Sequence, residues 1–457
     1  MLRVAVVGSG PSGVYSAQGL VQRSGPPDVR VDVLDRLPCP YGLVRYGVAP
    51  DHEKIKSLQN NLRTVLEDER VRFLGGVEVG PGGVPVARLR ELYHAVVYCV
   101  GASTDRRLGV PGEELPGSWS ATEFVSWYSA HPDAAADAFV AGARSAVVIG
   151  VGNVAVDVTR ILARTAPELS PTDIPQAALG ALAASEVTEI SMVGRRGPSQ
   201  ARFTTKELRE LGGLPEAGIS VDEAELALDP AYLDPSGLPA AQRRNVEVLR
   251  GWAAAAPRDR PRLIRPRFFL RPVELLADGG RVGAVRFERT VPDGAGGVTG
   301  TGRFEEIEAQ LVLRSVGYRG VPLDGLPFDA DRGTVPQRAG RVLRDGVVSP
   351  GEYVAGWIKR GPTGVIGTNR PCAKETVTSL LEDAPGLVRR EAADDPLAAL
   401  RAEGIRPVEW AGWQAIERAE AELGARLGRE VVKLPGWDAL WTAARTAGSD
   451  AARADGF

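Results

Sequence analysis

Short apolar runs that end on glycine recur along this chain and predict buried parallel strands. The first run, residues 4–7, is followed by a Gly-x-Gly-x-x-Gly turn at residues 8–13 and by a helix-compatible stretch, residues 14–23. A second run, residues 29–34, ends in Asp35. A continuous apolar run bounded by turn residues is typical of a strand that is buried on both faces. The chain is therefore predicted to open with a strand–turn–helix–strand unit.

The first glycine turn has the spacing of a dinucleotide-binding loop. Gly8 allows a tight turn, Gly10 lets the backbone approach a diphosphate, and Gly13 lets helix and strand pack closely. The diphosphate would lie at the helix N-terminus, where free N–H groups and the helix dipole favour negative charge. Asp35 follows at roughly the 20-residue spacing expected of an acid that binds a ribose. The combination favours a dinucleotide site over ordinary turn glycines.

Further runs extend this first unit. The Gly- and Pro-punctuated stretch at residues 38–52 is predicted to be an ordered loop, and a helix is expected at residues 52–67. Apolar runs predict strands at residues 71–79 and 95–100. The Pro- and Gly-rich residues 108–118 that follow are a candidate domain boundary.

The opening pattern returns at residues 145–164, with a Gly-x-Gly-x-x-Ala turn at residues 150–155. Two such turns predict two dinucleotides, most simply FAD and a nicotinamide cofactor. The strand expected at residues 187–193 ends beside Arg195 and Arg196. A carboxylate there would repel a 2′-phosphate, whereas guanidinium groups bind one bidentately. The pair therefore predicts NADP rather than NAD, the alternative being two solvated arginines at a strand end.

The rest of the chain alternates between polar excursions and short strands. Residues 198–275 are rich in Pro, Ala and Arg and are predicted to be surface helices of a second domain. Strands are expected to resume at residues 282–290, 307–316 and 353–357. The last strand leads through a Gly/Pro loop into a helix. Its N-terminus behind Gly364 would stabilise electron density on a reduced flavin.

Composition narrows the class of protein. The 457 residues allow two or three domains, and the net charge of −3 argues against a nucleic-acid protein. No apolar run approaches the roughly 20 residues of a membrane span. The three cysteines are far apart, which argues against an iron–sulfur cluster, a dithiol redox centre and a disulfide framework in this chain. Because the fold starts at residue 2, no targeting segment is expected, and a cytoplasmic location is predicted.

Four longer motifs make the chain resemble the adrenodoxin reductase family of ferredoxin–NADP+ reductases, including its bacterial members. They are YGLVRYGVAPDH at residues 41–52, GNVA at 152–155, VGRRGP at 193–198 and GWIKRGPTGVI at 356–366. Such long stretches are far more specific than glycine turns. The resemblance runs from residue 2 to about residue 383.

The resemblance implies which residues contact the two cofactors. Contacts with FAD are assigned to Ser12, Asp35, Leu43, Val77, Trp357, Gly364, Val365 and Ile366, besides the loop glycines Gly8, Gly10 and Gly13. Contacts with NADP are assigned to Gly152, Asn153, Val154, Arg195, Arg196, Glu207 and Gly364, besides the loop residue Gly150. Family members often carry Glu at the Asp35 position, and Asp is one methylene shorter.

The family also suggests that NADPH gives a hydride to FAD, which passes single electrons to a small acidic iron–sulfur protein. His52 and Asp157 are candidates for a polar network near the flavin, and Trp357 is a third candidate for the catalytic site. Hydride transfer needs no protein acid or base, so tuning rather than a proton relay is expected. The ordinary alternatives are a helix-start residue for His52, a first-turn acid for Asp157 and a capping-box residue for Glu207, three positions after Thr204.

A basic surface is expected to receive the acidic partner. Arg243 and Arg244 lie on one turn of a predicted helix, and Arg209 is near them in sequence. In the resembling family a basic surface there binds the iron–sulfur protein, and exposed charges of this kind steer association. The alternative is that these arginines are simply solvated, because arginine is abundant in this chain.

The predicted fold class is α/β, with two Rossmann-like dinucleotide-binding domains. The FAD domain comprises residues 1–104 and 320–457, the latter with a helical C-terminal extension, and the NADP domain, residues 105–319, is inserted. The predicted function is that of an NADPH–ferredoxin reductase. An alternative is the electron-supplying subunit of a glutamate synthase-like complex, which would need cluster-binding cysteines. A disulfide reductase would need a cysteine pair, and an NADP-sensing module would not need the flavin-facing segment.

Overall fold

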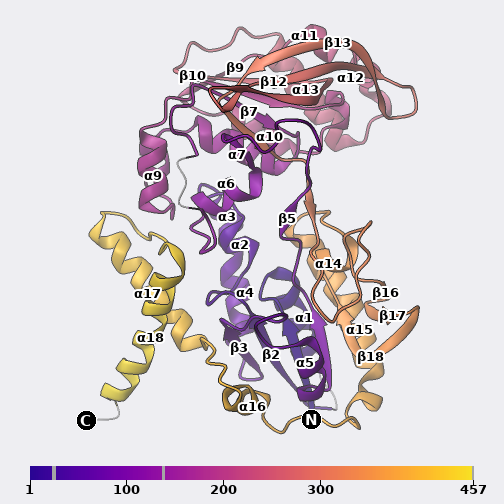
Figure 1. Ribbon diagram of the computed structural model, residues 1–457, viewed down its shortest axis with the longest axis vertical. Coiled ribbons are helices and arrows are strands. Elements are labelled where there is room, and N and C mark those ends of the chain that lie inside the picture. The colour runs from indigo at the N-terminus through magenta and orange to yellow at the C-terminus, as the bar shows by residue number, and fades with distance from the viewer. Residues whose placement is uncertain (23–26, 136–138, 455–457) are drawn as a thin grey trace.

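Two sheets form two units stacked along the long axis of the molecule (Figure 1). The computed structural model describes residues 1–22, 27–135 and 139–454, with residues 448–454 described for the backbone alone. The expected α/β class is confirmed, because both sheets are built mainly from parallel strands that alternate with helices.

The lower sheet has seven strands in the order β16-β17-β18-β4-β1-β2-β3. They are β1 (Leu2–Val7), β2 (Val29–Asp35), β3 (Val71–Gly75), β4 (Ala95–Tyr98), β16 (Gln337–Arg338), β17 (Arg341–Arg344) and β18 (Val347–Val354). The run β18-β4-β1-β2-β3 is parallel, and β16 and β17 extend one edge in antiparallel pairing. This sheet is therefore made by the two ends of the chain.

Alternation along β1 divides its side chains between two cores. Val4 and Val6 pack with α1 (Pro11–Gln22) and α15 (Asn369–Leu387) on one face. Ala5 and Val7 pack with α5 (Val86–Leu92) on the other. Successive side chains of a strand point to opposite faces, so an unbroken apolar run is what a sheet covered on both sides requires.

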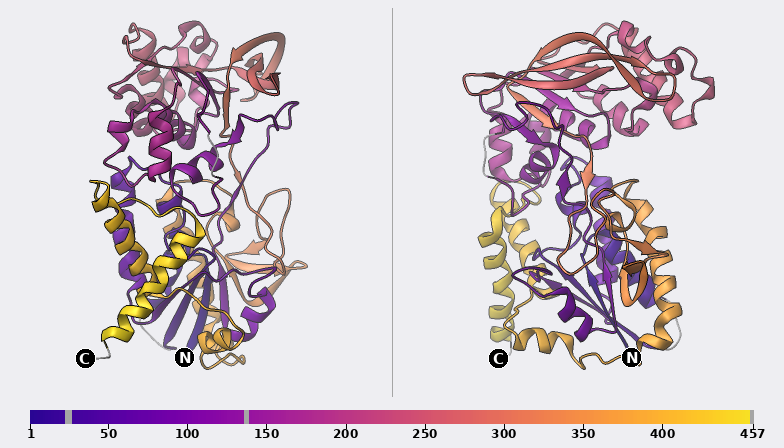
Figure 2. Two further views of the ribbon diagram at one scale, coloured as in Figure 1. Left: turned by 60° about the vertical axis from the view of Figure 1, so that its left-hand side comes forward. Right: turned by 45° about the vertical axis from the view of Figure 1, so that its right-hand side comes forward.

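The upper sheet has six parallel strands in the order β6-β14-β7-β8-β10-β9. They are β6 (Ser118–Ser120), β7 (Ser145–Ile149), β8 (Glu189–Val193), β9 (Ala217–Ile219), β10 (Arg262–Arg267) and β14 (Leu311–Arg314). One face packs on α6 (Ala121–Tyr128) and α7 (Asn153–Ala163). The other face packs on an antiparallel sheet of β11 (Leu270–Asp278), β12 (Arg281–Pro292) and β13 (Val298–Glu308), which crosses the top of the molecule in Figure 2.

The chain crosses between the two units twice, at neighbouring points. Before the upper sheet it forms β5 (Thr104–Asp105), and after it β15 (Tyr318–Arg319). These two short strands pair antiparallel, with Tyr318 opposite Asp105. The upper sheet is thus inserted between strands β4 and β16 of the lower one.

Several expected elements differ in detail. The helix expected at residues 52–67 is two, α3 (Glu53–Lys56) and α4 (Leu58–Leu66). The expectation of helices alone for residues 198–275 is wrong, because β9 and β10 complete the upper sheet. Only Ile264 and Pro266 of β10 are buried. Its three arginines interrupt the apolar run that would have predicted a strand.

Two other strands end earlier than expected. The strand expected at residues 307–316 is the end of β13 and the separate β14. The strand expected at residues 353–357 stops at Val354, and Trp357 begins α14 (Trp357–Arg360). The turn between them needs Gly356, whose φ of +78° is strained for other residues.

The C-terminal helices α16 (Pro396–Ala402), α17 (Trp410–Arg426) and α18 (Gly436–Ala454) run beside the lower unit and reach the upper one (Figure 1). Trp413 is buried and meets the Tyr41 ring edge-on at 5.8 Å. Buried Lys433 donates to the Arg45 carbonyl at 2.6 Å and forms an ion pair with Asp173 of the upper unit at 3.3 Å. Burial lowers the pKa of Lys433 to about 7. The tail therefore links the two units.

Among the described residues, no helix is both long and apolar enough to cross a bilayer.

Replacing Arg45 by Met should lower the free energy of unfolding by about 3–5 kcal/mol, because it leaves a buried carboxylate without its cation. Arg45 donates to both carboxylate oxygens of Glu420 at 2.6 and 3.1 Å, and both side chains are almost completely buried. Urea unfolding followed by tryptophan fluorescence measures the change. Arg88→Met is the matched control, since Arg88 pairs with Glu403 at the surface, where such a pair contributes at most about 1 kcal/mol. Equal losses would contradict the special weight of the buried pair.

Candidate functional site

The first glycine loop connects β1 to α1 and leaves open space above the helix. Gly8 has a φ of +109°, and a Cβ there would lie 2.5 Å from the Cys99 carbonyl oxygen. A Cβ at Gly13 would lie 1.8 Å from the Gly8 carbonyl oxygen, so helix and strand approach too closely for any side chain. A Cβ at Gly10 would meet only the Cα of Gly42, at 3.8 Å. Packing therefore demands glycine at two positions, and the third keeps the N-terminus of α1 accessible.

Buried donors without partners lie on this loop and in the segment 357–360, which follows the turn that approaches it. Among the described residues, no hydrogen-bond partner is found for the Ser12 hydroxyl, the Trp357 indole N–H or Nη1 of Arg360. A Cβ at Gly356 would lie 2.6 Å from Ser12 Oγ, which brings the β18–α14 turn against α1. An unsatisfied buried polar group costs about 1–3 kcal/mol. An accessible helix N-terminus with an unpaired donor of its own, Ser12, fits an anionic, hydrogen-bonding ligand such as the diphosphate of FAD.

Asp35 braces the loop from the end of β2. Its Oδ2 accepts from the Ser9 N–H at 2.8 Å and from the Ser9 hydroxyl at 2.5 Å, and its Oδ1 accepts from the Leu37 N–H at 2.9 Å. Burial raises the pKa of Asp35 despite these bonds. A carboxylate offers about four acceptor sites. Three are used inside the protein, so one is left for the ribose contact expected from the sequence.

The other residues assigned to FAD lie in different settings. Leu43 begins α2 (Leu43–Tyr46), next to Gly42, and is 41% exposed. Val365 is 57% exposed, directly after Gly364, whose φ is +83°, and before the half-buried Ile366. These apolar side chains are free to contact a ring system. The Val77 side chain is buried in the core beside β1, and its N–H donates to the Asp35 carbonyl at 2.8 Å.

The second glycine loop repeats this geometry in the upper unit. Gly150 has a φ of +144°, and a Cβ there would lie 2.2 Å from the Ser315 carbonyl oxygen. A Cβ at Gly152, the N-cap of α7, would meet no heavy atom within 4 Å. The Asn153 side-chain oxygen accepts from the Thr204 N–H at 2.8 Å, and Val154 is half-buried beside it. The loop again offers a helix N-terminus under open space.

Two arginines stand at the end of β8 with no acid to pair with. Arg195 is exposed and Arg196 half-buried, and among the described residues neither forms an ion pair with a carboxylate. Burial, followed by the positive charges of Arg195 and Arg202, lowers the pKa of Arg196. Uncompensated guanidinium groups fit a phosphate dianion, which each can bind through two N–H groups. Arg202 was not singled out from the sequence.

A buried polar cluster joins the two units. His52 Nε2 lies 2.9 Å from Glu210 Oε2 and 3.2 Å from Glu207 Oε2, and its Nδ1 lies 3.9 Å from Asp157. Arg160 donates to Asp157 at 2.8 Å and lies 3.5 Å from both glutamates. The structure thus brings together His52, Asp157 and Glu207, three residues singled out from the sequence. Arg160 and Glu210 were missed, although an arginine inside the apolar helix 153–163 was a visible signal.

The capping-box interpretation of Glu207 is wrong for its side chain. The Thr204 hydroxyl does accept from the Glu207 N–H at 3.4 Å, at the start of α10 (Thr205–Gly212). The Thr204 N–H, however, is taken by Asn153 rather than by Glu207. The carboxylate is therefore free to face His52, and burial raises its pKa.

Trp357 forms a separate group from this cluster. Its ring packs on the Tyr318 ring, with centroids 5.3 Å apart and planes 33° from parallel. Tyr318 belongs to β15, one of the two crossings between units. The indole thus lies where the lower sheet meets the crossing.

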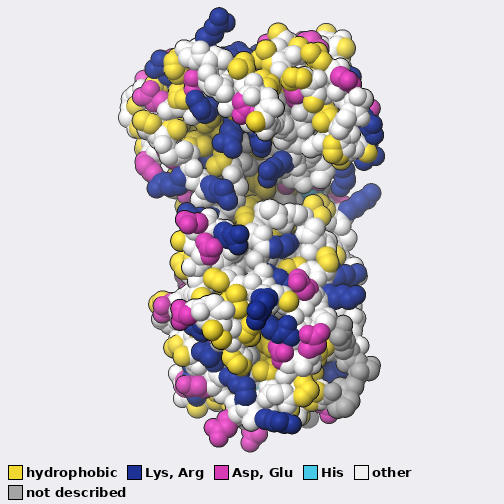
Figure 3. All heavy atoms as spheres, turned by 90° about the vertical axis from the view of Figure 1, so that its right-hand side faces the viewer, with side chains coloured by type: hydrophobic (Ala, Val, Ile, Leu, Met, Phe, Trp, Pro, Cys, Tyr) yellow, Lys and Arg dark blue, Asp and Glu magenta, His cyan; other side chains and the backbone are white. Residues whose placement is uncertain are grey.

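The basic residues expected to receive a partner lie on two neighbouring helices. Arg209 of α10 and Arg244 of α13 (Ala240–Ala253) line a hollow of about 410 Å³ with Thr205, Lys206 and Glu210. Arg243 is exposed on α13 as well. Since Glu210 also contacts His52, the hollow borders the polar cluster. On the face shown in Figure 3, Lys and Arg side chains are spread over both units, with several at the narrowing between them.

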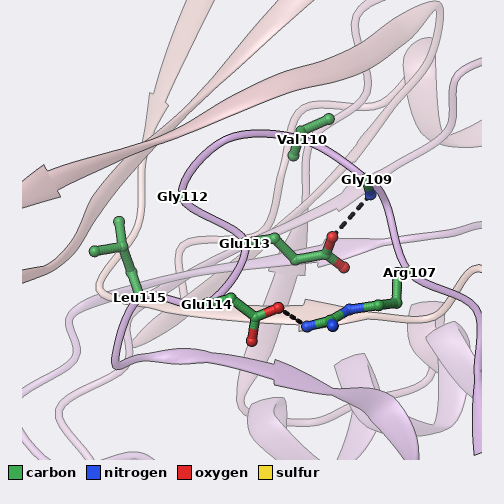
Figure 4. A pocket seen from close by; sticks show the side chains of 7 residues that line it. All are labelled: Arg107, Gly109, Val110, Gly112, Glu113, Glu114 and Leu115. Atoms are coloured by element: carbon green, nitrogen blue, oxygen red, sulfur yellow. Dashed lines mark hydrogen bonds and ion pairs between the residues drawn. The ribbon is translucent and has the colours of Figure 1, made fainter.

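A second hollow, of about 440 Å³, lies in the turn at residues 107–115 (Figure 4). The Glu113 carboxylate accepts from the N–H groups of Leu108 and Gly109 at 2.7 and 2.8 Å and from Arg314 at 3.1 Å. Arg107 and Glu114 form an ion pair across it. The polar groups of this turn are satisfied by one another, which is the pattern of a structural turn.

Comparison with known proteins agrees with this geometry. The family model for pyridine nucleotide-disulphide oxidoreductases matches residues 2–208. Mitochondrial NADPH:adrenodoxin oxidoreductase of Arabidopsis thaliana is 40% identical over 97% of this chain and 95% of its own. NADPH-ferredoxin reductase FprA of Mycobacterium tuberculosis is 45% identical over 94% of this chain and 96% of its own. The structure of M. tuberculosis FprA in complex with NADPH superposes with a TM-score of 0.90 at 43% identity, covering 98% of this chain and 99% of that one. The chain belongs to the family of adrenodoxin reductases and NADPH–ferredoxin reductases.

Proposed function

We propose that this protein is an FAD enzyme that transfers electrons from NADPH to a small iron–sulfur protein. The observation that carries the proposal is the pair of glycine loops, one ending in open space beside unpaired donors and the other beside unpaired arginines. The full-length similarity to NADPH–ferredoxin reductases supports the same activity. An electron-supplying subunit of a glutamate synthase-like complex is favoured by no observation.

We further propose that residues 1–104 and 320–457 hold FAD and that residues 105–319 hold NADPH. The pairing of β5 with β15 supports these boundaries, because both crossings fall there. The lower sheet then belongs to the FAD domain and the upper sheet to the NADP domain. A cytoplasmic location stays a prediction.

The lower unit would bind FAD through main-chain and side-chain donors. The Gly8–Gly13 loop would receive the diphosphate, with Ser12 donating to it, and Asp35 would use its free acceptor site on the ribose. Leu43 and Val365 would contact the ring system of FAD, and the Trp357 indole N–H would donate a hydrogen bond to FAD. FAD, when bound, can accept a two-electron hydride and release electrons one at a time.

NADPH bound to the upper unit would extend from the Gly150–Gly152 loop to Arg195 and Arg196. The N-terminus of α7 at Asn153 would receive the diphosphate, and Arg195 and Arg196 would bind the 2′-phosphate. His52, from the lower unit, meets Asp157 of α7 in the cluster that contains Glu207. We propose that this cluster tunes the charge beside the reacting rings, since Glu207 can hold a proton more readily than an exposed carboxyl.

Replacing both Arg195 and Arg196 with Ala should raise KM for NADPH by roughly 100-fold or more and leave KM for NADH nearly unchanged. Hydrogen bonds to charged groups contribute about 1.5–3 kcal/mol each, and about 1.4 kcal/mol corresponds to tenfold. Steady-state reduction of a dye with each coenzyme measures the effect. Equal losses with both coenzymes would show that the arginines serve the structure instead.

His52→Gln should shift the pH dependence of flavin reduction to higher pH. The charge of His52 lowers the pKa of Glu207, which burial raises, so removing that charge allows Glu207 to stay protonated to higher pH. Stopped-flow reduction by NADPH between pH 5 and 9, roughly the range in which such groups titrate, measures the shift. His131→Gln is the control, because burial lowers the pKa of His131 to about 4 and keeps it neutral. An unchanged profile in His52→Gln would remove its proposed role.

The activity is tested by following NADPH oxidation with and without an acidic ferredoxin, beside a small neutral dye. Both acceptors should be reduced, and only ferredoxin reduction should fall as salt is added, because exposed charges mainly steer association. Arg243→Glu with Arg244→Glu should slow ferredoxin reduction and flatten its salt dependence without affecting the dye.

The matched control reverses Arg418 and Arg426, two exposed arginines of α17 that form no ion pair among the described residues. If both double variants act alike, or if the dye slows as much as ferredoxin, then Arg243 and Arg244 are not the docking site. Failure to reduce any ferredoxin would overturn the proposed function itself.

A further inference from the structure

The chain returns to the second glycine loop after β8 and places a third arginine there. The Arg202 N–H donates to the Val151 carbonyl at 2.8 Å, in the middle of the Gly150–Gly152 loop. Val151 itself packs against Gly194, where a Cβ would lie 3.0 Å from the Val151 side chain. Val151 of the glycine loop therefore contacts both the end of β8 and the backbone of Arg202.

The segment that carries Arg202 is held firmly on both sides. Ala201 and Phe203 are buried, and the Phe203 carbonyl accepts from the Asn245 amide at 3.0 Å. Upstream, the buried Asp229 accepts from the Ser199 N–H at 2.9 Å. Between these anchors the Arg202 side chain is exposed. Its backbone is fixed while its guanidinium is free to meet a ligand.

The three guanidinium groups form a positive cluster that no carboxylate among the described residues neutralises. Arg202 is close enough to Arg196 for its charge, with that of Arg195, to disfavour the Arg196 cation. None of the three forms an ion pair with a carboxylate in the part of the chain that the structure describes. By contrast, Arg267 and Arg289 of the same unit share Glu225 at 2.6 and 2.8 Å. Mutual repulsion of cations is relieved by a bound dianion.

We propose that Arg202 binds the 2′-phosphate of NADPH together with Arg195 and Arg196, and so contributes to the choice of NADPH over NADH. This inference rests on the proposed binding of NADPH. The 2′-phosphate is preferred to the diphosphate as its target because the neighbouring cations are the strand-end arginines. The diphosphate has the N-terminus of α7, above Gly152, as its own binding site.

The test compares two adenine nucleotides that cannot exchange electrons, 2′,5′-ADP and 5′-ADP, by calorimetric titration of the FAD-loaded protein. Arg202→Ala should weaken binding of 2′,5′-ADP about tenfold, the low end for a charge-assisted hydrogen bond at an exposed site. Binding of 5′-ADP should not change. The loss for 2′,5′-ADP should shrink in high salt, because exposed charges are screened. Arg202→Lys keeps the charge but cannot bind a phosphate through two N–H groups. Its affinity for 2′,5′-ADP should lie between those of the unmodified protein and Arg202→Ala.

Arg260→Ala is the matched control, an exposed arginine of the same unit that forms no ion pair among the described residues. Equal weakening of both nucleotides would overturn the proposal in favour of a contact with the 5′-phosphate that both carry, and unchanged binding of both would overturn it outright. The double variant Arg195→Ala, Arg196→Ala distinguishes failure of the proposed NADPH site from failure of the proposed role of Arg202. If it too leaves 2′,5′-ADP binding unchanged, the proposed NADPH site fails. If it weakens binding while Arg202→Ala does not, only the role of Arg202 fails.

Discussion

The completely buried guanidinium of Arg160 is the constraint on which the junction of the two units depends. A buried cation must be matched by acids, and Arg160 finds them in both units: Asp51 at 2.7 Å and Asp157 at 2.8 Å, with Glu207 farther away at 3.5 Å. Burial opposes ionisation of Asp51, but the hydrogen bonds and charge of Arg160 hold its pKa below the usual value. Because Asp51 and His52 are neighbours in the chain, the ion pair between Asp51 and Arg160 also places the His52 imidazole against the upper unit.

This arrangement explains why structure and candidate chemistry coincide at the junction. Removing one partner of a buried charge pair leaves the other uncompensated, so the units are held in one relative position. The same carboxylates that compensate Arg160 surround His52. Burial raises the pKa of Glu207, the charge of His52 lowers it, and the charges of Asp157 and Glu210 raise it. A second link, from Lys433 to Asp173 and the Arg45 carbonyl, uses the C-terminal tail to fasten the opposite side. Electron transfer between two bound cofactors requires such fixed spacing.

The two glycine loops show one physical solution used twice. In both, a glycine at positive φ turns the chain beneath a carbonyl oxygen that would collide with any Cβ, and a second glycine leaves the helix N-terminus open. The loops then diverge in the residue that ends the following strand. Asp35 turns inward and braces its own loop through Ser9, whereas Arg195 and Arg196 form no ion pair with any described carboxylate. The first loop is thus braced by an inward-facing acid, whereas the second is bordered by positive charge.

The sequence by itself determined the fold class, the two loops and the arginine pair, because each is a local pattern. An apolar run buried on both faces, a glycine forced by a close backbone approach and a charge at a strand end are all set within a few residues of one another. The sequence also marked His52 and Asp157 as candidates for a polar network and Glu207 as a contact of NADP, each with an ordinary local role as the alternative. Only the tertiary structure decided that these three meet. They come from the residue before α3, from α7 and from α10, and contacts between segments so far apart in the chain leave no periodic signal. It also decided that Asn153 displaces Glu207 from its helix cap, that the arginine-rich residues 262–267 are a strand, and that Arg202 returns to the glycine loop. In each case a partner distant in sequence outweighed the local preference, because burial and hydrogen bonding are satisfied by whatever the fold brings near.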